Sequence, residues 1–257
     1  MTKMKYELIF CIGYNKTGTT SLYQSIANLG FPYYPGSMMA QAEFLMSDIY
    51  RGLNTNDFEP LYLWIDECIR LGVCVVKDVP FSLPNVWKKV YEKYPNAKFV
   101  LSERDSPEQW YNSIYNFHQK AFAEFKDNPA PSWNDVAQVD YRYKGYLFQH
   151  LSMLNNDSRE SLPYDKESMI NSYNSHNNEV KEFFKDKGNF ISLNVSNDNA
   201  YLKLCSFLNA QPIESAFLKL KITNEPGTWD ISYCNIEHAK QKYKFLVRSE
   251  AKRLGII

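Results

Sequence analysis

The segment that most constrains the fold lies early in the chain, where a short apolar run leads directly into a glycine loop and a helical pattern. Residues 8–12 are all apolar, as in a strand buried on both faces. Gly13 and Gly18 bracket the loop, and Leu22 and Ile26 then recur at helical spacing. Such a loop offers backbone N–H groups and the positive end of a helix dipole to an anion. The sequence therefore predicts an anion site at the end of a first buried strand.

The loop places its lysine in an unusual position. In the nucleotide-triphosphate loop G-x-x-x-x-G-K-[ST], the lysine follows the second glycine and the next hydroxyl holds magnesium. Here Thr19 takes that position, and Lys16 lies inside the loop. Hydroxyl groups for an anion come from Thr17, Thr19, Thr20 and Ser21. We therefore predict an anion site that is poorly suited to magnesium-ATP. A plain strand-to-helix turn with capping hydroxyls is the alternative.

The rest of the chain alternates between strand-like apolar runs and helical patterns. Further strands are expected at residues 73–76, 98–102 and 189–193, and helices at 39–51, 57–71, 83–94, from 106, 141–154 and 167–187. This alternation predicts parallel strands joined by helical crossovers, an α/β fold of three layers with four or five strands. We expect a single domain over residues 1–257, with a surface insertion at 127–140 and a C-terminal helix at 235–254.

Composition narrows the class of partner. The 257 residues include 29 Lys and Arg against 29 Asp and Glu, so no overall positive field favours nucleic acid. No apolar stretch approaches the roughly 20 residues of a membrane helix, and the early apolar run is too short for a signal peptide. The five cysteines form no C-x-x-C pair. We expect a soluble, cytoplasmic protein that needs no metal.

A second polar site follows the predicted strand at 98–102. Arg104 comes just after this strand, and Ser106 with Pro107 has the pattern of a helix N-cap and first helical position. Ser113 falls on the flank of the expected apolar face of that helix, which consists of Trp110, Ile114, Phe117 and Ala121. The alternative for Arg104 is an ion pair with a neighbouring acidic residue. Otherwise Arg104 and Ser113 form a second anion site.

Together the two motifs resemble the sulfotransferases that use 3′-phosphoadenosine 5′-phosphosulfate (PAPS), which have a P-loop-type fold. Residues 16–22 look like the 5′-phosphosulfate loop of that family, and Arg104 with Ser113 looks like its 3′-phosphate motif. Residues 189–224 are similar to the C-terminal half of one branch of the family. The resemblance implies one site for a doubly phosphorylated nucleotide.

The chain departs from the family pattern in three places. Asn15 stands where many members have proline before the lysine. Ser113 follows Arg104 by nine positions, whereas many cytosolic members have eight; here position eight is Asn112. A late Arg-Lys-Gly motif is not evident, and Lys219, Lys221 and Arg253 are equally open as substitutes.

The resemblance also implies a reaction. The sulfuryl group would pass from PAPS to a hydroxyl of a small-molecule or carbohydrate acceptor, with an amine as the second choice. Lys16 would stabilise charge on the bridging oxygen, and Asp78 occupies the position that carries the base in the family. A surface aspartate that caps a helix or pairs with Lys77 is the alternative for Asp78. His176 falls on an apolar helical stripe and is expected in the core.

Two other functions stay open at this point. One is a P-loop kinase that acts on a small molecule, and the other is a catalytically silent nucleotide-binding or scaffold protein of the same fold. Aromatic residues that could line an acceptor pocket are Tyr33, Tyr34, Phe81 and Trp133. They do not identify an acceptor.

Overall fold

The structure is a computed structural model, and it describes most of the chain. The described residues are 7–31, 50–70, 73–77, 79–84, 86–122, 125, 128–141, 144–155 and 158–218. The expected helix at 235–254 and nearly all of the one at 39–51 lie outside them, as does Asp78. Backbone contacts divide the chain into two compact units, Met1–Pro32 with Cys74–Asn224, and Tyr33–Val73 with Glu225–Ile257. The expectation of a single domain stays a prediction.

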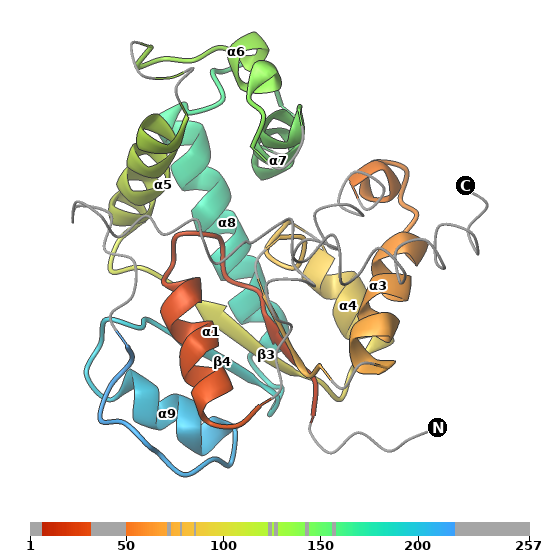
Figure 1. Ribbon diagram of the computed structural model, residues 1–257, viewed down its shortest axis with the longest axis vertical. Helices are drawn as coiled ribbons and strands as arrows, with labels where there is room; N and C mark the ends of the chain where they lie inside the picture. Colours follow the sequence, from red (N-terminus) through yellow and green to blue (C-terminus); the bar gives the residue numbers. More distant parts are fainter. Residues whose placement is uncertain are drawn as a thin grey trace, which may run out of the picture. The chain divides into compact units, whose positions relative to one another are not determined.

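The first unit contains a sheet of four parallel strands. They are β1 (Ile9–Cys11), β2 (Val75–Lys77), β3 (Lys98–Ser102) and β4 (Phe190–Leu193), in the spatial order β2-β1-β3-β4. Helices flank this sheet, as Figure 1 shows. The predicted α/β fold with a parallel sheet is therefore confirmed.

Aromatic side chains fill one face of the sheet. Phe10, Phe99 and Phe190 are neighbours in the strand register, and the rings of Phe10 and Phe99 stack with centroids 5.4 Å apart. Phe184, the last residue of α8 (Lys166–Phe184), stacks on Phe190 at 4.7 Å. The ring centroid of Tyr91, in α4 (Val86–Lys93), lies 5.7 Å from that of Phe99. Stacked and tilted rings of this kind bury large apolar areas, so this layer is a main part of the core.

The helix after β1 covers the opposite face. Helix α1 (Thr19–Asn28) buries Leu22 and Ile26, as its sequence spacing predicts, and it lies against β2. Figure 1 shows α1 in front of the sheet and α8 behind it. The sheet is thus covered on both faces, which explains why its strands are apolar throughout.

The remaining helices of the first unit are α5 (Pro107–Ala121), α6 (Trp133–Gln138), α7 (Tyr146–Leu154) and α9 (Ala200–Phe207). Helices α6 and α7 pack together, and both lie at the top of Figure 1. The segment 127–140, expected as a surface insertion, contains α6 with a full capping box at Ser132 and Asp135. Helix α9 was not predicted. In the second unit the structure describes α3 (Glu59–Arg70), inside the predicted 57–71.

Helix α5 begins as the sequence predicts but presents a different face. The Ser106 hydroxyl accepts from the Gln109 N–H at 3.1 Å, so Ser106 is the N-cap. The expected apolar stripe included Ala121, which is exposed, whereas His118 is buried with Trp110 and Ile114. The buried positions of α5 are four residues apart, at 110, 114 and 118, and position 118 is a histidine.

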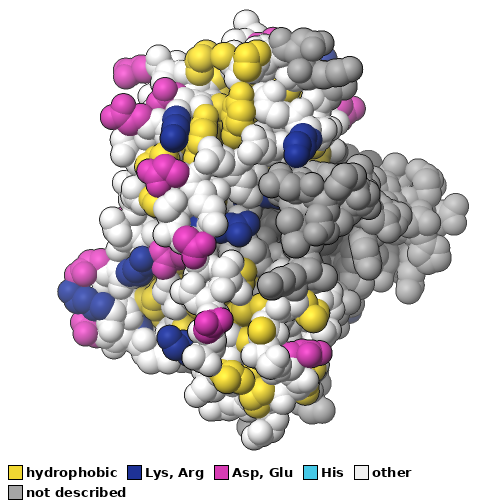
Figure 2. All heavy atoms as spheres, turned by 90° about the vertical axis from the view of Figure 1, so that its left-hand side faces the viewer, with side chains coloured by type: hydrophobic (Ala, Val, Ile, Leu, Met, Phe, Trp, Pro, Cys, Tyr) yellow, Lys and Arg dark blue, Asp and Glu magenta, His cyan; other side chains and the backbone are white. Residues whose placement is uncertain are grey.

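Two further properties concern the distribution of surface charge and the apolarity of the helices. Acidic and basic side chains lie close to one another on the face displayed in Figure 2. Among the described residues, none of the helices is long and apolar enough to cross a membrane.

Candidate active site

The two predicted anion motifs meet at one edge of the sheet. Strand β1 pairs with β2 on one side and with β3 on the other, so the strand order reverses between β1 and β3. In open α/β sheets, ligands bind at the carboxyl ends of the strands at such a switch point. The glycine loop follows β1 and Arg104 follows β3, which places both at this point.

The loop approaches the end of β3 so closely that glycine is required at position 13. A Cβ atom on Gly13 would lie 2.4 Å from Ser102 Oγ and 2.5 Å from the Ser102 carbonyl oxygen. Next to it, the buried Thr17 hydroxyl donates to the Tyr14 carbonyl at 2.6 Å and lies 2.6 Å from Ser102 Oγ. The Thr17 hydroxyl therefore fastens the loop to β3, and its contact with a ligand stays a prediction.

The loop ends in an open helix N-terminus. Lys16 and Gly18 have φ values of 69° and 87°, in the left-handed region, and Gly18 is the N-cap of α1 without a side-chain cap. The first N–H groups of the helix therefore face the loop region without a capping side chain, as anion binding requires. Of the three predicted hydroxyl residues in this first turn, Thr19 and Ser21 are largely buried and Thr20 is half-buried.

Side chains from other elements hold the carbonyl groups around the loop. His176 Nε2–H donates to the Ile12 carbonyl at 3.0 Å, and Trp110 Nε1–H donates to the Asn15 carbonyl at 3.0 Å. Arg104 Nε–H donates to the Lys16 carbonyl at 2.7 Å. These three carbonyl oxygens are thus satisfied by protein donors, which favours a loop whose remaining polar face is positive.

The support beneath the loop is aromatic. Tyr14 is fully buried, with its ring centroid 4.3 Å from that of His176 and 5.6 Å from that of Trp110. Trp110 stacks on Tyr173 at 4.6 Å. His176 is 3% exposed, which confirms it as a core histidine, and burial lowers its pKa from 6.5 to about 4.

Arg104 links the loop to the rest of the site. Its backbone N–H donates to the Tyr173 hydroxyl at 3.0 Å, and its guanidinium donates to the Lys16 carbonyl. Burial lowers the pKa of Arg104 from its ordinary value, but a guanidinium stays charged in proteins. Arg104 lines two neighbouring cavities.

The first cavity lies in front of the glycine loop and has a volume of about 170 Å³. Its wall opposite the loop comes from α5 and α7 and includes Phe117, Tyr146 and Leu147. Lys16 Nζ lies 4.2 Å from the centroid of Phe117. Ser113 is half-buried one helical turn before Phe117, on the same flank of α5, and is not among the residues that line this cavity.

Two buried histidines also line this first cavity. His118 Nδ1 is hydrogen-bonded to the hydroxyl of Tyr164 at 2.7 Å. His150 Nε2 lies 3.4 Å from the amide nitrogen of Asn15, next to Lys16 in the loop. Burial, with smaller effects from His150 and Lys16, holds the pKa of His118 well below 6.5. Sequence reasoning missed both residues, although the four-residue spacing from Ile114 could have shown that His118 faces inward.

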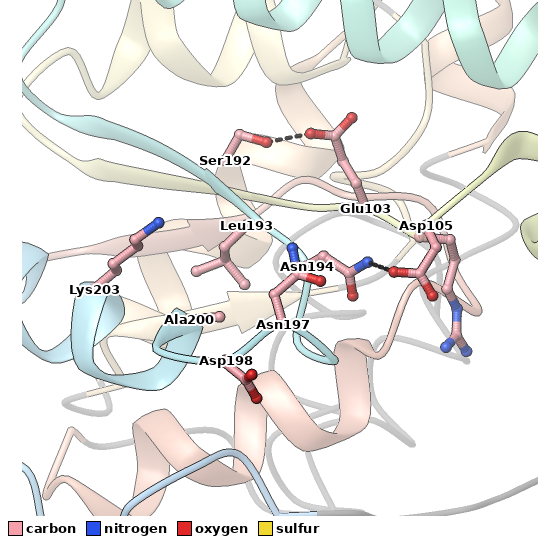
Figure 3. A pocket seen from close by; sticks show the side chains of 10 residues that line it. Glu103, Asp105, Ser192, Leu193, Asn194, Asn197, Asp198, Ala200 and Lys203 are labelled. Atoms are coloured by element: carbon pink, nitrogen blue, oxygen red, sulfur yellow. Dashed lines mark hydrogen bonds between the residues drawn. The ribbon is translucent and has the colours of Figure 1, made fainter.

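The second cavity has a volume of about 420 Å³ and lies where β3 and β4 end, beside α9. Figure 3 shows that Ser192 donates to Glu103 and that Asn194 donates to Asp105, the latter at 2.6 Å. Lys203 of α9 also lines this cavity. Acidic and basic groups are therefore mixed here, with Arg104 at the border to the first cavity.

Other predicted residues fall in three groups. Asp78, Tyr33 and Tyr34 lie outside the described residues, although Val79 lines the first cavity. Phe81 is fully buried, and its ring centroid lies 5.4 Å from that of Phe10, so Phe81 belongs to the core. The Trp133 ring nitrogen donates to the Ser161 carbonyl at 2.8 Å. Among the described residues, no group of three or more His, Cys, Asp or Glu is arranged to hold a metal ion.

The comparison with protein families agrees with this arrangement. A family model described as "Sulfotransferase domain" matches residues 8–220, which include the glycine loop, all four strands and Arg104. The chain therefore belongs to the sulfotransferase domain family, and this match supports a transferase of sulfuryl groups. No curated protein matches the sequence.

Proposed function

We propose that the protein transfers a sulfuryl group from PAPS to a hydroxyl of a small-molecule or carbohydrate acceptor. The hydrogen bond of 2.7 Å between Arg104 Nε and the Lys16 carbonyl is the observation that carries this proposal. It joins a loop suited to a 5′-phosphosulfate to an arginine suited to a 3′-phosphate. A donor with phosphates at both positions matches these two adjacent anion sites.

The residues of the loop would hold the 5′ end of the donor. The backbone N–H groups from Gly18 onward and the hydroxyl of Thr20 offer hydrogen bonds, and Lys16 supplies the positive charge. Arg104 and Ser113 would hold the 3′-phosphate. The second cavity, beyond Arg104, offers room for the nucleoside.

The reaction then needs little more than position and charge. The acceptor oxygen forms a bond to sulfur while the bond from sulfur to the bridging oxygen of the 5′-phosphate breaks, leaving 3′-phosphoadenosine 5′-phosphate. Lys16 would stabilise the negative charge that develops on this bridging oxygen. The acceptor proton would pass to Asp78, the residue at the position of the family's base.

The lining of the first cavity supports a hydroxyl over an amine as the acceptor group. Among its described lining residues, the charged ones are Lys16 and Arg104, and none is a carboxylate. The carboxylate that the proposal adds is Asp78, which serves as the base; an amine would have to approach these two cations and lose its extra proton first, whereas a hydroxyl is already neutral. The aromatic wall at Phe117 and Tyr146 would contact an apolar or sugar face of the acceptor.

Calorimetry with two nucleotides tests the donor. We expect 3′-phosphoadenosine 5′-phosphate to bind without magnesium, and magnesium-ATP to bind at least tenfold more weakly. The opposite preference would support a P-loop kinase and overturn the proposal. Binding of the bisphosphate without any transfer in a screen of acceptors with labelled donor would support the catalytically silent alternative.

Two substitutions test the chemistry once an acceptor is found. Lys16→Ala should lower kcat by about 100-fold or more, since it removes charge from the transition state. Asp78→Asn should lower kcat with little change in donor affinity. Full activity of Asp78→Asn would remove Asp78 from the proposal and leave the donor assignment intact.

A further inference from the structure

The first cavity has an unusual feature for an anion site, which is a pair of buried histidines opposite a lysine. His118 and His150 are each 2% exposed, and both line the cavity that Lys16 enters from the loop. They come from different helices, α5 and α7, so the fold brings them together. The proposed mechanism uses neither of them.

His118 is held in a defined orientation. Its Nδ1 is bonded to the Tyr164 hydroxyl at 2.7 Å, and Tyr164 is itself buried. Burial raises the pKa of Tyr164 well above 10, so this hydroxyl keeps its proton. Because Nδ1 is engaged and the ring lines the cavity, Nε2 is the nitrogen that can donate to a ligand there.

We propose that His118 is an additional residue of the anion site, which takes up one proton when the sulfuryl or phosphate group enters and donates it from Nε2 to an oxygen of that group. As imidazolium, His118 would have two N–H donors. Nδ1–H would point to the Tyr164 oxygen and Nε2–H to the anion. Both donors would therefore be satisfied.

The charges around His118 explain why the proton would arrive only with the anion. The described groups that share its cavity are the cations Lys16 and Arg104 and the titratable rings of His150, Tyr141 and Tyr146, while Tyr164 holds Nδ1. None of these is a carboxylate. In the empty cavity, burial and the neighbouring cations therefore favour neutral His118, and its pKa lies well below 6.5.

An anion reverses this balance. One negative charge about 5 Å from an imidazole raises its pKa by about two at an effective dielectric constant of about 20. A sulfuryl group next to a phosphate brings at least two charges. The inference rests on the proposed function only in naming PAPS as the source of that anion.

Histidine-ring NMR of the full chain tests the proton directly. The pKa of His118 is measured alone, with sodium sulfate, and with 3′-phosphoadenosine 5′-phosphate, using sodium chloride at equal ionic strength as the blank. His118→Asn assigns the signal. Sulfate is a useful probe because it does not titrate between pH 5 and 8. We expect the pKa of His118 to rise by at least one with either anion.

Calorimetry provides a second measurement. Binding of the bisphosphate at pH 6, in two buffers with different heats of protonation, gives the number of protons taken up. We expect the wild type to take up close to one proton more than His118→Asn, in which the amide can still bond Tyr164. Asn116→Ala, on the exposed side of α5, is the control and should match the wild type.

The pH dependence has a definite sign. Proton uptake makes binding tighter as the pH falls from the pKa of His118 in the complex toward its pKa in the empty site. We expect wild-type affinity for the bisphosphate to exceed that of His118→Asn by about tenfold at pH 6, and the two to converge above pH 8. The ligand's own titration is common to both proteins and cancels in this ratio.

The outcomes separate this inference from the proposed function. If the bisphosphate binds but the pKa of His118 does not rise and both proteins take up equal protons, the inference is overturned and the donor assignment stands. If the bisphosphate does not bind but sulfate raises the pKa of His118, the inference stands without PAPS. If neither anion has an effect, both are overturned.

Discussion

The guanidinium of Arg104 donates from Nε to the backbone carbonyl of Lys16 across 2.7 Å, although 88 positions separate the two residues in the chain. This bond joins the ends of β1 and β3 at the point where the strand order reverses. The remaining N–H groups of Arg104 can serve a ligand, since a guanidinium has five donors in a fixed plane. Arg104 thus has a structural role, and we propose that its remaining donors bind the 3′-phosphate.

Arg104→Ala should weaken binding of 3′-phosphoadenosine 5′-phosphate by about 10- to 100-fold, the cost of losing charge-assisted hydrogen bonds to a phosphate. Binding of adenosine 5′-phosphate, which lacks the 3′-phosphate, should fall much less. Calorimetry with both nucleotides measures the difference. Arg104→Lys retains the charge and should recover only part of the preference, because lysine cannot reproduce the planar donors. An equal loss for both nucleotides would contradict a specific role at the 3′-phosphate.

Ser113→Ala tests the second member of the predicted 3′-phosphate motif. The loss of one hydroxyl that bonds a charged group should weaken bisphosphate binding by about tenfold. Asn112→Ala is the matched control, because Asn112 is exposed on α5 and occupies the position at which many family members have the serine. If Asn112→Ala is the more harmful change, the alignment of the motif is shifted by one residue. The same calorimetric titration distinguishes the two.

Local signals explain how much of this fold the sequence predicted. Strand β3 was predicted at its exact bounds because a five-residue run, apolar at its centre, ends at a polar Ser-Glu-Arg sequence. Helix α5 was recognised from Ser106 and Pro107, which form a cap within a few residues of each other. Helix α9 was missed, since its N-cap, Asn199, makes no side-chain cap bond and the helix has only eight residues. Such a short helix depends on tertiary packing for its stability.

The supports of the site were beyond sequence reasoning for a different reason. The bond from Trp110 to the Asn15 carbonyl spans 95 positions, and that from His176 to the Ile12 carbonyl spans 164. Periodicity shows that both residues are buried, but it does not show which backbone group each one meets. The position of His150 in the cavity could not be predicted for the same reason, because it depends on how α7 packs near the loop. Motifs therefore located the loop and Arg104, but not the residues that hold them in place.

Gly13→Ala should strongly destabilise the protein, although Gly13 has no positive φ value. The added methyl group would lie 2.5 Å and 2.7 Å from the Ser102 carbonyl oxygen and nitrogen, and backbone atoms in a sheet cannot move aside cheaply. We expect a loss of about 1–3 kcal/mol or more in the free energy of unfolding. Gly188→Ala is the control, since a Cβ there meets nothing within 4 Å. Urea unfolding should place this control within about 0.5 kcal/mol of the wild type, and similar losses in the two variants would argue against the close contact.

His176 should make the protein less stable in mild acid. Its pKa is about 4 in the folded protein against 6.5 in the unfolded chain, so the unfolded chain binds the proton first as the pH falls. The contribution of neutral His176 to the free energy of unfolding is complete above pH 6.5 and is lost progressively between pH 6.5 and 4, with a total of about 3 kcal/mol.

His176→Gln tests this prediction, because its side-chain amide does not titrate and its N–H can take the place of ring Nε2–H as the donor to the Ile12 carbonyl. Urea unfolding of both proteins at pH 7.5 and pH 4.5 should show a distinctly smaller loss for His176→Gln. His118 also has a lowered pKa and contributes to the loss in both proteins, so the difference between them isolates His176. Identical losses would mean that His176 accepts its proton in the folded protein.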